Sequence, residues 1–241
     1  MNSALQLLSW DTEFLGYRVG RLHAEVVTAP IIQGLLEEAR SLDFRLLYWS
    51  VSPNDKMANY TAQLIGAYLA DRKITYVMPI TSALTVLPEG VETTSKLSSQ
   101  LVSLALQSGH QSRYQNDPGF ADDVFERLYT QWIENSVNGK IAREALIYRS
   151  NQLPDELGLI TLGTKQGRVD IGLLAVDERM RGQEIGSQLV DAAKQRARAW
   201  GFGVLQVVTQ VSNIGACRFY ERCGFTTDSL EHIYHVWLPR G

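Results

Sequence analysis

Apolar and polar positions recur along the chain with two different periods, which predicts a mixture of helices and strands. The strongest helical pattern covers 183–200, where apolar residues fall on one stripe and charged residues fall elsewhere. A β-branched segment at 204–209 predicts a strand, 213–223 predicts a short helix, and 232–238 predicts a closing strand. We therefore expect an α/β protein with an α+β mixed sheet.

The rest of the chain alternates in the same way. The pattern predicts two strands around a turn at 11–16, helices at 30–42, 59–67, 96–107 and 121–137, a loop at 111–119, and strands at 45–51, 73–80, 144–150, 157–163 and 168–176. The segment 82–95 is rich in Thr, Ser, Pro and Gly and is the best linker candidate. Because 241 residues suit one to two domains, we predict domains at 1–90 and 91–241.

Two parts of the chain resemble each other. Both 45–80 and 204–238 run from a strand through Val-Ser, a short helix and a glycine into a strand that contains tyrosine. They are either two ordinary strand–helix–strand pieces or a duplicated half-domain. In the second case the first copy has lost a ligand loop, because nothing like 181–186 precedes residue 90.

Composition narrows the function classes. Apolar residues make up 45% and charged residues 20%, which excludes a disordered chain. A net charge of −3 argues against nucleic acid or an anionic membrane as partner. The longest uncharged segments, 74–88 and 97–112, are shorter than the ~18 residues of a membrane span. With Cys217 and Cys223 poorly spaced for a disulfide and no metal-ligand spacing around the four histidines, we expect a cytoplasmic protein without a metal.

The most informative segment is 170–189, where a strand enters a turn that contains Arg181, Gly182 and Gly186 before a helix begins. Backbone N–H groups at a helix N-terminus have no partner within the helix, and the helix dipole adds partial positive charge there. The glycines permit close approach to the backbone, and Arg179 and Arg181 add charge. This pattern predicts a phosphate site.

The segment 181–187 resembles the R/Q-x-x-G-x-G/A turn of the GNAT superfamily of N-acetyltransferases, in which this turn binds the pyrophosphate of acetyl-CoA. The segments 209–213 and 219–225 resemble the next region of that family, and the resemblance covers about 97–238. It implies a GNAT fold and acetyl-CoA as co-substrate. The turn departs from the family pattern at Glu184, where glycine is usual, so this acidic side chain must point away from the phosphates.

The resemblance implies a set of site residues. Tyr220 matches the general acid that protonates the CoA thiolate, and the main chain of the strand before the turn would bind pantetheine. The implied cofactor-binding residues are Leu174, Ala175, Val176, Arg181, Gly182, Gln183, Glu184, Ile185, Gly186, Ser187 and Asn213. The alternative interpretations are that Tyr220 is a packing residue and that Asn213 is a helix cap. Asp170, Glu178 and Glu134 are candidates for the general base by position only, and a water relay is an equal alternative.

Six segments, at 10–16, 112–114, 128–136, 171–176, 209–213 and 234–237, resemble GNAT enzymes that acetylate the amine of a nucleotide-linked 4-amino-4,6-dideoxysugar. These enzymes carry a partial GNAT-like domain before the GNAT domain. The resemblance implies a dTDP-amino sugar as the small-molecule acceptor, with Arg113 on its phosphates or, equally, at the surface.

Two alternatives remain open. One is a GNAT acetyltransferase for a peptide N-terminus or another small amine. The other is a non-catalytic acyl-CoA-binding module, against which Tyr220 argues because a sensor needs no acid for the thiolate. Edge strands of the predicted sheet also make a homodimer plausible.

Overall fold

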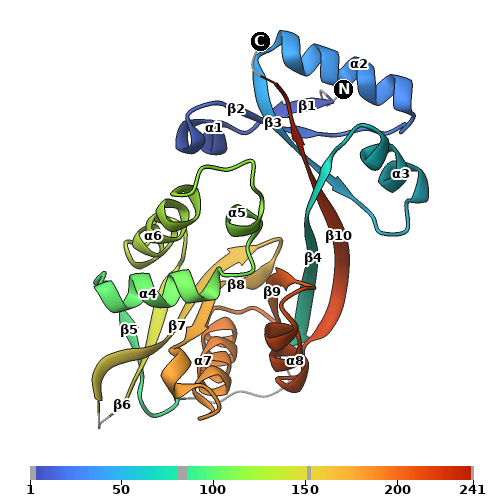
Figure 1. Cartoon of the computed structure of the whole chain (residues 1–241). Coiled ribbons are helices and arrows are strands. Elements are labelled where there is room, and N and C mark those ends of the chain that lie inside the picture. Colours follow the sequence, from blue (N-terminus) through green and yellow to red (C-terminus); the bar gives the residue numbers. More distant parts are fainter. Residues whose placement is uncertain (1–3, 81–85, 151–152, 240–241) are drawn as a thin grey trace. The chain divides into compact units, whose positions relative to one another are not determined.

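The computed structural model describes residues 4–80, 86–150 and 153–239, and Figure 1 shows the chain with its elements labelled. The strands are β1 (Leu5–Leu7), β2 (Arg18–Leu22), β3 (Phe44–Val51), β4 (Tyr68–Pro79), β5 (Val91–Thr94), β6 (Glu144–Ser150), β7 (Leu153–Lys165), β8 (Arg168–Val176), β9 (Val204–Gln210) and β10 (Thr226–Trp237). The helices are α1 (Ser9–Leu15), α2 (Ala29–Ser41), α3 (Lys56–Leu64), α4 (Ser99–Ser108), α5 (Arg113–Asn116), α6 (Val124–Val137), the 3-10 helix η1 (Glu178–Met180), α7 (Ile185–Ala199) and α8 (Ile214–Arg222). The expected mixture of helices and strands is confirmed.

Two compact units make up the chain. Unit 1 contains 1–73, 116–120 and 230–241, and unit 2 contains 74–115 and 121–229. Each unit has its own cluster of buried hydrophobic side chains. The division at residue 73 differs from the expected boundary at residue 90.

Unit 1 is built on strands in the order β1-β2-β3-β10. β1 pairs antiparallel with β2, β2 pairs parallel with β3, and β3 pairs antiparallel with β10. The parallel pair requires a crossover, which α2 supplies. Ile32, Leu36 and Ala39 recur at helical spacing on α2 and are buried in the core of this unit.

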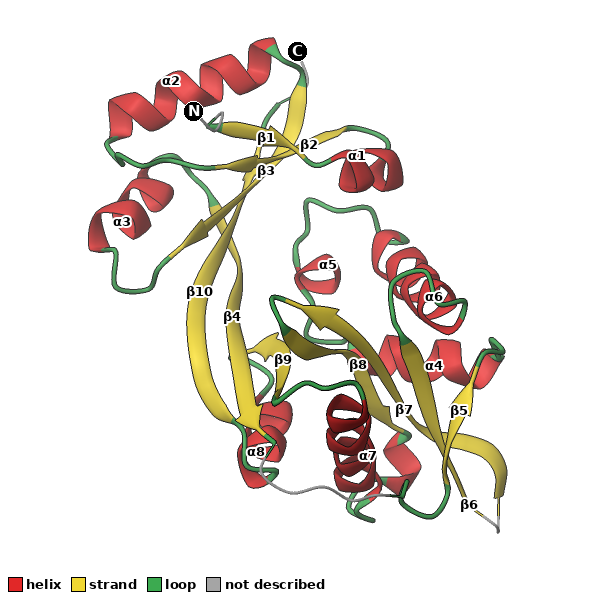
Figure 2. Cartoon of the chain, turned by 180° about the vertical axis from the view of Figure 1, so that it is seen from behind, coloured by secondary structure: helices red, strands yellow, loops and turns green. Residues whose placement is uncertain are grey.

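Unit 2 is built on strands in the order β4-β9-β8-β7-β6-β5. The strands from β5 to β8 pair antiparallel, whereas β8 pairs parallel with β9 through the crossover helix α7. Figures 1 and 2 show α7 on one face of these strands and α4 and α6 on the other. A Cβ at Gly158 would come within 2.9 Å of Ile185 and Leu189, so the glycine on β7 lets α7 approach the sheet.

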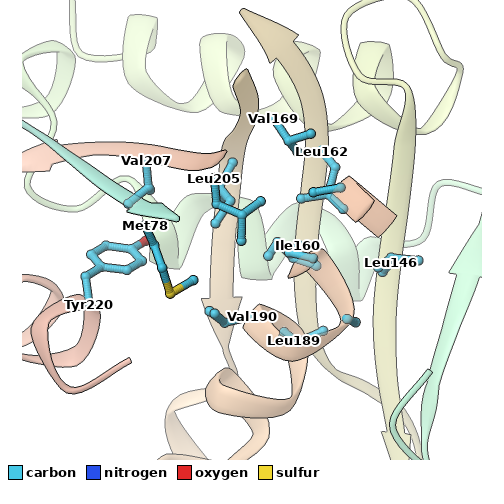
Figure 3. Packing of buried hydrophobic residues seen from close by; sticks show 14 of the residues in the cluster. Met78, Leu146, Ile160, Leu162, Val169, Leu189, Val190, Leu205, Val207 and Tyr220 are labelled. Carbon is cyan, nitrogen blue, oxygen red and sulfur yellow. The ribbon is translucent and has the colours of Figure 1, made fainter. Parts of the chain in front are cut away.

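Strands β4 and β10 each pass from one unit into the other. In β4, Ile74, Tyr76 and Met78 alternate into the core of unit 2, and Figure 3 places Met78 beside Tyr220 and Val207. The far end of β10 is buried in the core of unit 1. Composition marked 82–95 as a linker, but composition carries no information about which core a strand enters.

The segment 116–120 belongs to unit 1 although the residues on both sides of it belong to unit 2. Asp117 is buried and accepts hydrogen bonds from the indole N–H of Trp237 (2.9 Å) and the backbone N–H of Gly119 (2.8 Å). It also lies within hydrogen-bond distance of Nδ1 of the His235 imidazole on β10. These bonds attach the segment to β10.

Three local expectations were wrong. The expected turn at 11–16 is helix α1, which ends at Gly16 in the left-handed conformation (φ 74°). The expected linker contains β5, which pairs with β6, while residues 82–85 lie outside the described residues. The expected loop at 111–119 contains the single turn α5. Among the described residues, no helix is long and apolar enough to cross a membrane.

We predict that Met78→Ala destabilises the protein by about 2–5 kcal/mol, because it opens a cavity in the core of unit 2. Met57 on α3 is 59% exposed, so Met57→Ala should change stability by less than about 0.5 kcal/mol. Urea denaturation of both variants measures the difference. Equal stability of the two would show that β4 is not part of that core.

Candidate functional site

The site begins where β8 and β9 part. β8 pairs with β9 only over Val169–Ile171, whereas the later residues Leu174–Val176 pair with β7. Beyond that point unit 2 contains a cavity of about 650 Å³. Its walls come from the end of β8, the following turn, the first turn of α7, helix α8 and the end of α4. The lining residues are Gln107, Ser108, His110, Gln111, Leu174, Ala175, Val176, Met180, Arg181, Gly182, Glu184, Ile185, Gly186, Ser187, Asn213, Gly215, Ala216, Phe219, Tyr220 and Arg222.

A buried carboxylate fixes the turn after β8. Asp177 accepts hydrogen bonds from the guanidinium of Arg179 (2.9 and 2.8 Å), from the backbone N–H of Arg179 (3.0 Å) and from Gln100 on α4 (2.9 Å). The hydrogen bonds from Arg179 outweigh the desolvation and lower the pKa of Asp177 to about 2. Arg179, expected to charge the phosphate site, therefore binds Asp177 and does not line the cavity.

The turn itself uses left-handed backbone. Gly182 (φ 82°) adopts this conformation without steric cost, whereas Glu184 (φ 61°) adopts it as a non-glycine residue directly before α7. The family pattern has glycine at the position of Glu184, and this backbone gives the physical reason. Arg181 donates from Nε to the carbonyl of Val176 (3.2 Å), which holds its side chain at the wall of the cavity.

Helix α8 brings Tyr220 to the cavity. Its ring packs at 5.3–6.1 Å, centroid to centroid, from the rings of Tyr76, Phe219 and Phe225. Burial raises the pKa of the Tyr220 phenol above its ordinary value, so the hydroxyl is protonated at neutral pH. Asn213 caps α8 by accepting a hydrogen bond from the backbone N–H of Ala216 (3.1 Å), and it also lines the cavity.

The structure brings the predicted cofactor-binding residues and Tyr220 together around this one cavity, except Gln183. Arg113 is likewise not among the lining residues. It lies on α5, where its guanidinium stands 5.0 Å from the ring centroid of Tyr114 and donates to the hydroxyl (3.1 Å). The roles of all these residues stay predictions.

Sequence reasoning missed the wall formed by the end of α4. The side-chain oxygen of Gln107 accepts hydrogen bonds from the backbone N–H of Glu178 (3.2 Å) and from Arg181 (3.4 Å). No local pattern in the sequence indicates this packing of α4 beside the turn, because the two segments lie some seventy residues apart. Among the described residues, no group of three His, Cys, Asp or Glu side chains could hold a metal ion.

The sequence is similar to a known protein family and to two known proteins. A family model described as "Acetyltransferase (GNAT) family" matches residues 100–225. The dTDP-fucosamine acetyltransferase of Escherichia coli O6:H1 is 28% identical over 100% of this chain and 99% of its own length. The spore coat polysaccharide biosynthesis protein SpsD of Bacillus subtilis is 26% identical over 57% of this chain. The aligned part covers 46% of the length of that relative.

Solved structures share the fold at low sequence identity. A conserved protein of unknown function from Staphylococcus epidermidis has a TM-score of 0.70 and 16% identity, with 99% of this chain and 93% of that chain covered. A GCN5-related N-acetyltransferase from Sphaerobacter thermophilus has a TM-score of 0.63 and 12% identity, with coverages of 97% and 76%. The first match shows that the fold extends over both units of the chain.

We predict that Asp177→Asn lowers stability at pH 7 by about 1.5–3 kcal/mol, because charge-assisted hydrogen bonds from Arg179 are lost. The folded pKa of Asp177, about 2, lies below its ordinary value of 3.8. The stability that the carboxylate adds is therefore present above pH 4 and is lost as the pH falls through 2. Urea denaturation should therefore show that the difference in free energy of unfolding between Asp177→Asn and the wild type becomes smaller as the pH falls from 4 to 2.

The matched control is Asp155→Asn. Asp155 also faces Arg179, at 3.7 Å, but its side chain is 49% exposed, so this variant should change stability little at any pH. A gap for Asp177→Asn that persists at pH 2 would contradict the prediction.

Proposed function

Because the chain belongs to the acetyltransferase (GNAT) family, we propose that it transfers the acetyl group of acetyl-CoA to the amine of a nucleotide-linked amino sugar. One observation carries the proposal: a single cavity joins a glycine-containing helix N-terminus to a buried, protonated tyrosine. The first feature suits a pyrophosphate, and the second suits a leaving thiolate.

Acetyl-CoA would enter with its pyrophosphate at the N-terminus of α7. Arg181, Gly182 and the backbone N–H groups of Ile185–Ser187 would bind the phosphates, with the carboxylate of Glu184 turned away. The pantetheine would lie along Leu174–Val176, whose pairing side toward β9 is released by the parting of the strands. One backbone N–H there would stabilise the oxyanion of the attacked carbonyl.

The reaction needs no acyl-enzyme. The free amine attacks the thioester carbonyl, a C–N bond forms, and the C–S bond breaks as the tetrahedral intermediate collapses. Tyr220 donates its proton to the departing thiolate sulfur. A non-catalytic acyl-CoA-binding module would need no such donor in its cavity, so the position of Tyr220 favours catalysis over binding alone.

The acceptor is inferred from the relative from E. coli, because the alignment with that protein covers the whole chain and its name specifies dTDP-fucosamine. We propose a dTDP-linked 4-amino-4,6-dideoxysugar for this chain, with Arg113 on the diphosphate. A peptide N-terminus or another small amine remains the competing acceptor class, which an amine panel with thiol release as readout distinguishes.

We also propose that the first part of the chain is a partial GNAT-like domain. Apart from α1 in the first part and the 3-10 helix η1 in the second, β1-β2-α2-β3-α3-β4 and β7-β8-α7-β9-α8-β10 follow the same order, with an antiparallel pair, then a parallel pair around a crossover helix. The segment 23–28 before α2 contains no glycine, which fits the loss of a phosphate turn from the first copy.

We predict that Gly186→Val weakens binding of acetyl-CoA at least about tenfold, or 1.4 kcal/mol. The valine side chain would occupy the space in front of the α7 N-terminus, because even a Cβ added at Gly186 would lie 3.0 Å from the ring of Phe219. Calorimetry measures the affinity. Gly34→Val, at a helical glycine of α2 with no atom within 4 Å of its Cβ position, is the control. Unchanged affinity in folded Gly186→Val would exclude this turn as the phosphate site.

We predict that Tyr220→Phe lowers kcat by about 10²–10⁴-fold while KM for acetyl-CoA changes little, because a general acid is lost. Tyr76→Phe is the matched control. That buried phenol donates to Glu221 (2.9 Å) rather than into the cavity, so its loss should affect stability rather than kcat. A wild-type kcat for Tyr220→Phe across the pH range would assign Tyr220 to packing.

The acceptor is tested with dTDP-4-amino-4,6-dideoxygalactose and the free amino sugar as paired substrates. We expect the nucleotide form to have the higher kcat/KM, because binding energy from the nucleotide orients the amine. Arg113→Ala should raise KM for the nucleotide form and leave acetyl-CoA affinity unchanged. Equal kcat/KM for the two sugars would show that the nucleotide is not recognised.

A further inference from the structure

One group on the cavity wall has no role in the steps derived above. His110 follows the end of α4 directly after Gly109, and its exposed side chain lines the same cavity as Tyr220. Nothing in the sequence marks this histidine, because it has no ligand or catalytic spacing to any neighbour.

The backbone at His110 is held in place. A Cβ at Gly109 would come within 2.4 Å of the ring of Tyr129, so the chain packs tightly against α6 just before the histidine. The carbonyl of Gly109 accepts a hydrogen bond from the backbone N–H of Ser112 (2.7 Å). The imidazole itself stacks on Phe125, with centroids 6.3 Å apart and planes 27° apart. These contacts place the imidazole at the wall of the cavity.

The proposed reaction requires a base at this cavity. An amine attacks only after its ammonium form has lost a proton, and the base must reach that proton directly or through one water. The titratable and charged side chains that line the cavity among the described residues are His110, Arg181, Glu184, Tyr220 and Arg222.

Four of these five side chains do not suit the task. A guanidinium stays charged and has no acceptor atom, which excludes Arg181 and Arg222. Tyr220 must keep its proton for the thiolate. Glu184 stands directly before α7, at the proposed phosphate end of the cavity. The imidazole of a histidine changes charge near neutral pH and both accepts and releases protons.

The earlier candidates are not available in this cavity. Asp170, Glu178 and Glu134 are absent from its lining residues. Asp170 accepts a hydrogen bond from the side-chain amide of Gln206 (2.7 Å), on the buried part of β8 that pairs with β9. Position in the sequence therefore pointed to carboxylates that do not line this cavity.

We propose that His110 is the base that deprotonates the acceptor ammonium, an inference that rests on the proposed function. The imidazole takes one proton from the ammonium and the amine attacks the thioester. Tyr220 protonates the thiolate as the C–S bond breaks, and the second proton leaving the new amide nitrogen restores its phenol. The imidazolium then releases its proton to solvent, so one proton is released per acetyl transfer.

The test uses full-length His110→Ala and His110→Gln with acetyl-CoA and dTDP-4-amino-4,6-dideoxygalactose. We expect kcat/KM for the acceptor to fall by about 10²–10⁴-fold in both variants, with calorimetric affinity for acetyl-CoA unchanged. Added imidazole should restore turnover in His110→Ala with saturation, because a small base can occupy the vacated space. The wild type and Gln111→Ala, which alters the next cavity residue, should show no response to imidazole.

The pH profile gives an independent readout. The pH dependence of kcat/KM for the acceptor should differ between the wild type and both variants, because the variants lack the proposed base. A wild-type rate for His110→Ala overturns the inference, and so does a lowered rate with neither imidazole rescue nor a changed profile. A wild-type protein that releases no thiol with any amine overturns the proposed function as well, which separates the two failures.

Discussion

The parting of β8 from β9 is the constraint on which the rest of the site depends. If β8 continued to pair with β9 after Ile171, the backbone groups of Leu174–Val176 would form hydrogen bonds to β9, and no space would remain between the two strands. Parting exposes those groups, which need another polar partner, since unpaired backbone groups are costly when buried. It also leaves space beside the N-terminus of α7 and the start of α8. The cavity follows from this single interruption of the sheet.

The turn beyond β8 combines a rigid support with a strained residue. A left-handed backbone at a non-glycine residue such as Glu184 costs roughly 1–2 kcal/mol, and it persists only where the surrounding structure determines it. Asp177 holds the start of the same turn through Arg179 and Gln100. The turn is thus shaped before any ligand arrives, which reduces the ordering that binding would require.

The sequence predicted those parts of the structure that rest on local chemistry. The stripe on α7 is buried as expected, and the turn at 181–187 lies on the cavity because its glycines, arginine and helix start are adjacent in the chain. Parts that rest on distant contacts were not predictable. Four strand residues at 91–94 become β5 only because β6 offers an edge, and the end of α4 reaches the cavity only because α4 packs on unit 2.

The domain boundary shows the same limit. Glycine, proline and serine mark where a chain can turn, and 82–95 is rich in them, but the units divide at residue 73 because the buried side of β4 changes core within one continuous strand. No compositional signal accompanies that change. His110 is a further case, since a lone histidine in sequence becomes a candidate base only because the fold places it on the wall of the same cavity as Tyr220.

The crossing of β4 and β10 between the units sets an order on synthesis. As the chain leaves the ribosome, β3 is among the first strands made, yet its antiparallel neighbour β10 is the last strand of the described chain. Unit 1 must therefore wait, with one edge of its sheet open, while all of unit 2 is translated. An open edge is a template for pairing with other chains, and contacts so distant in sequence form slowly. The open edge of β3 therefore stays exposed to pairing with other chains until β10 has been made.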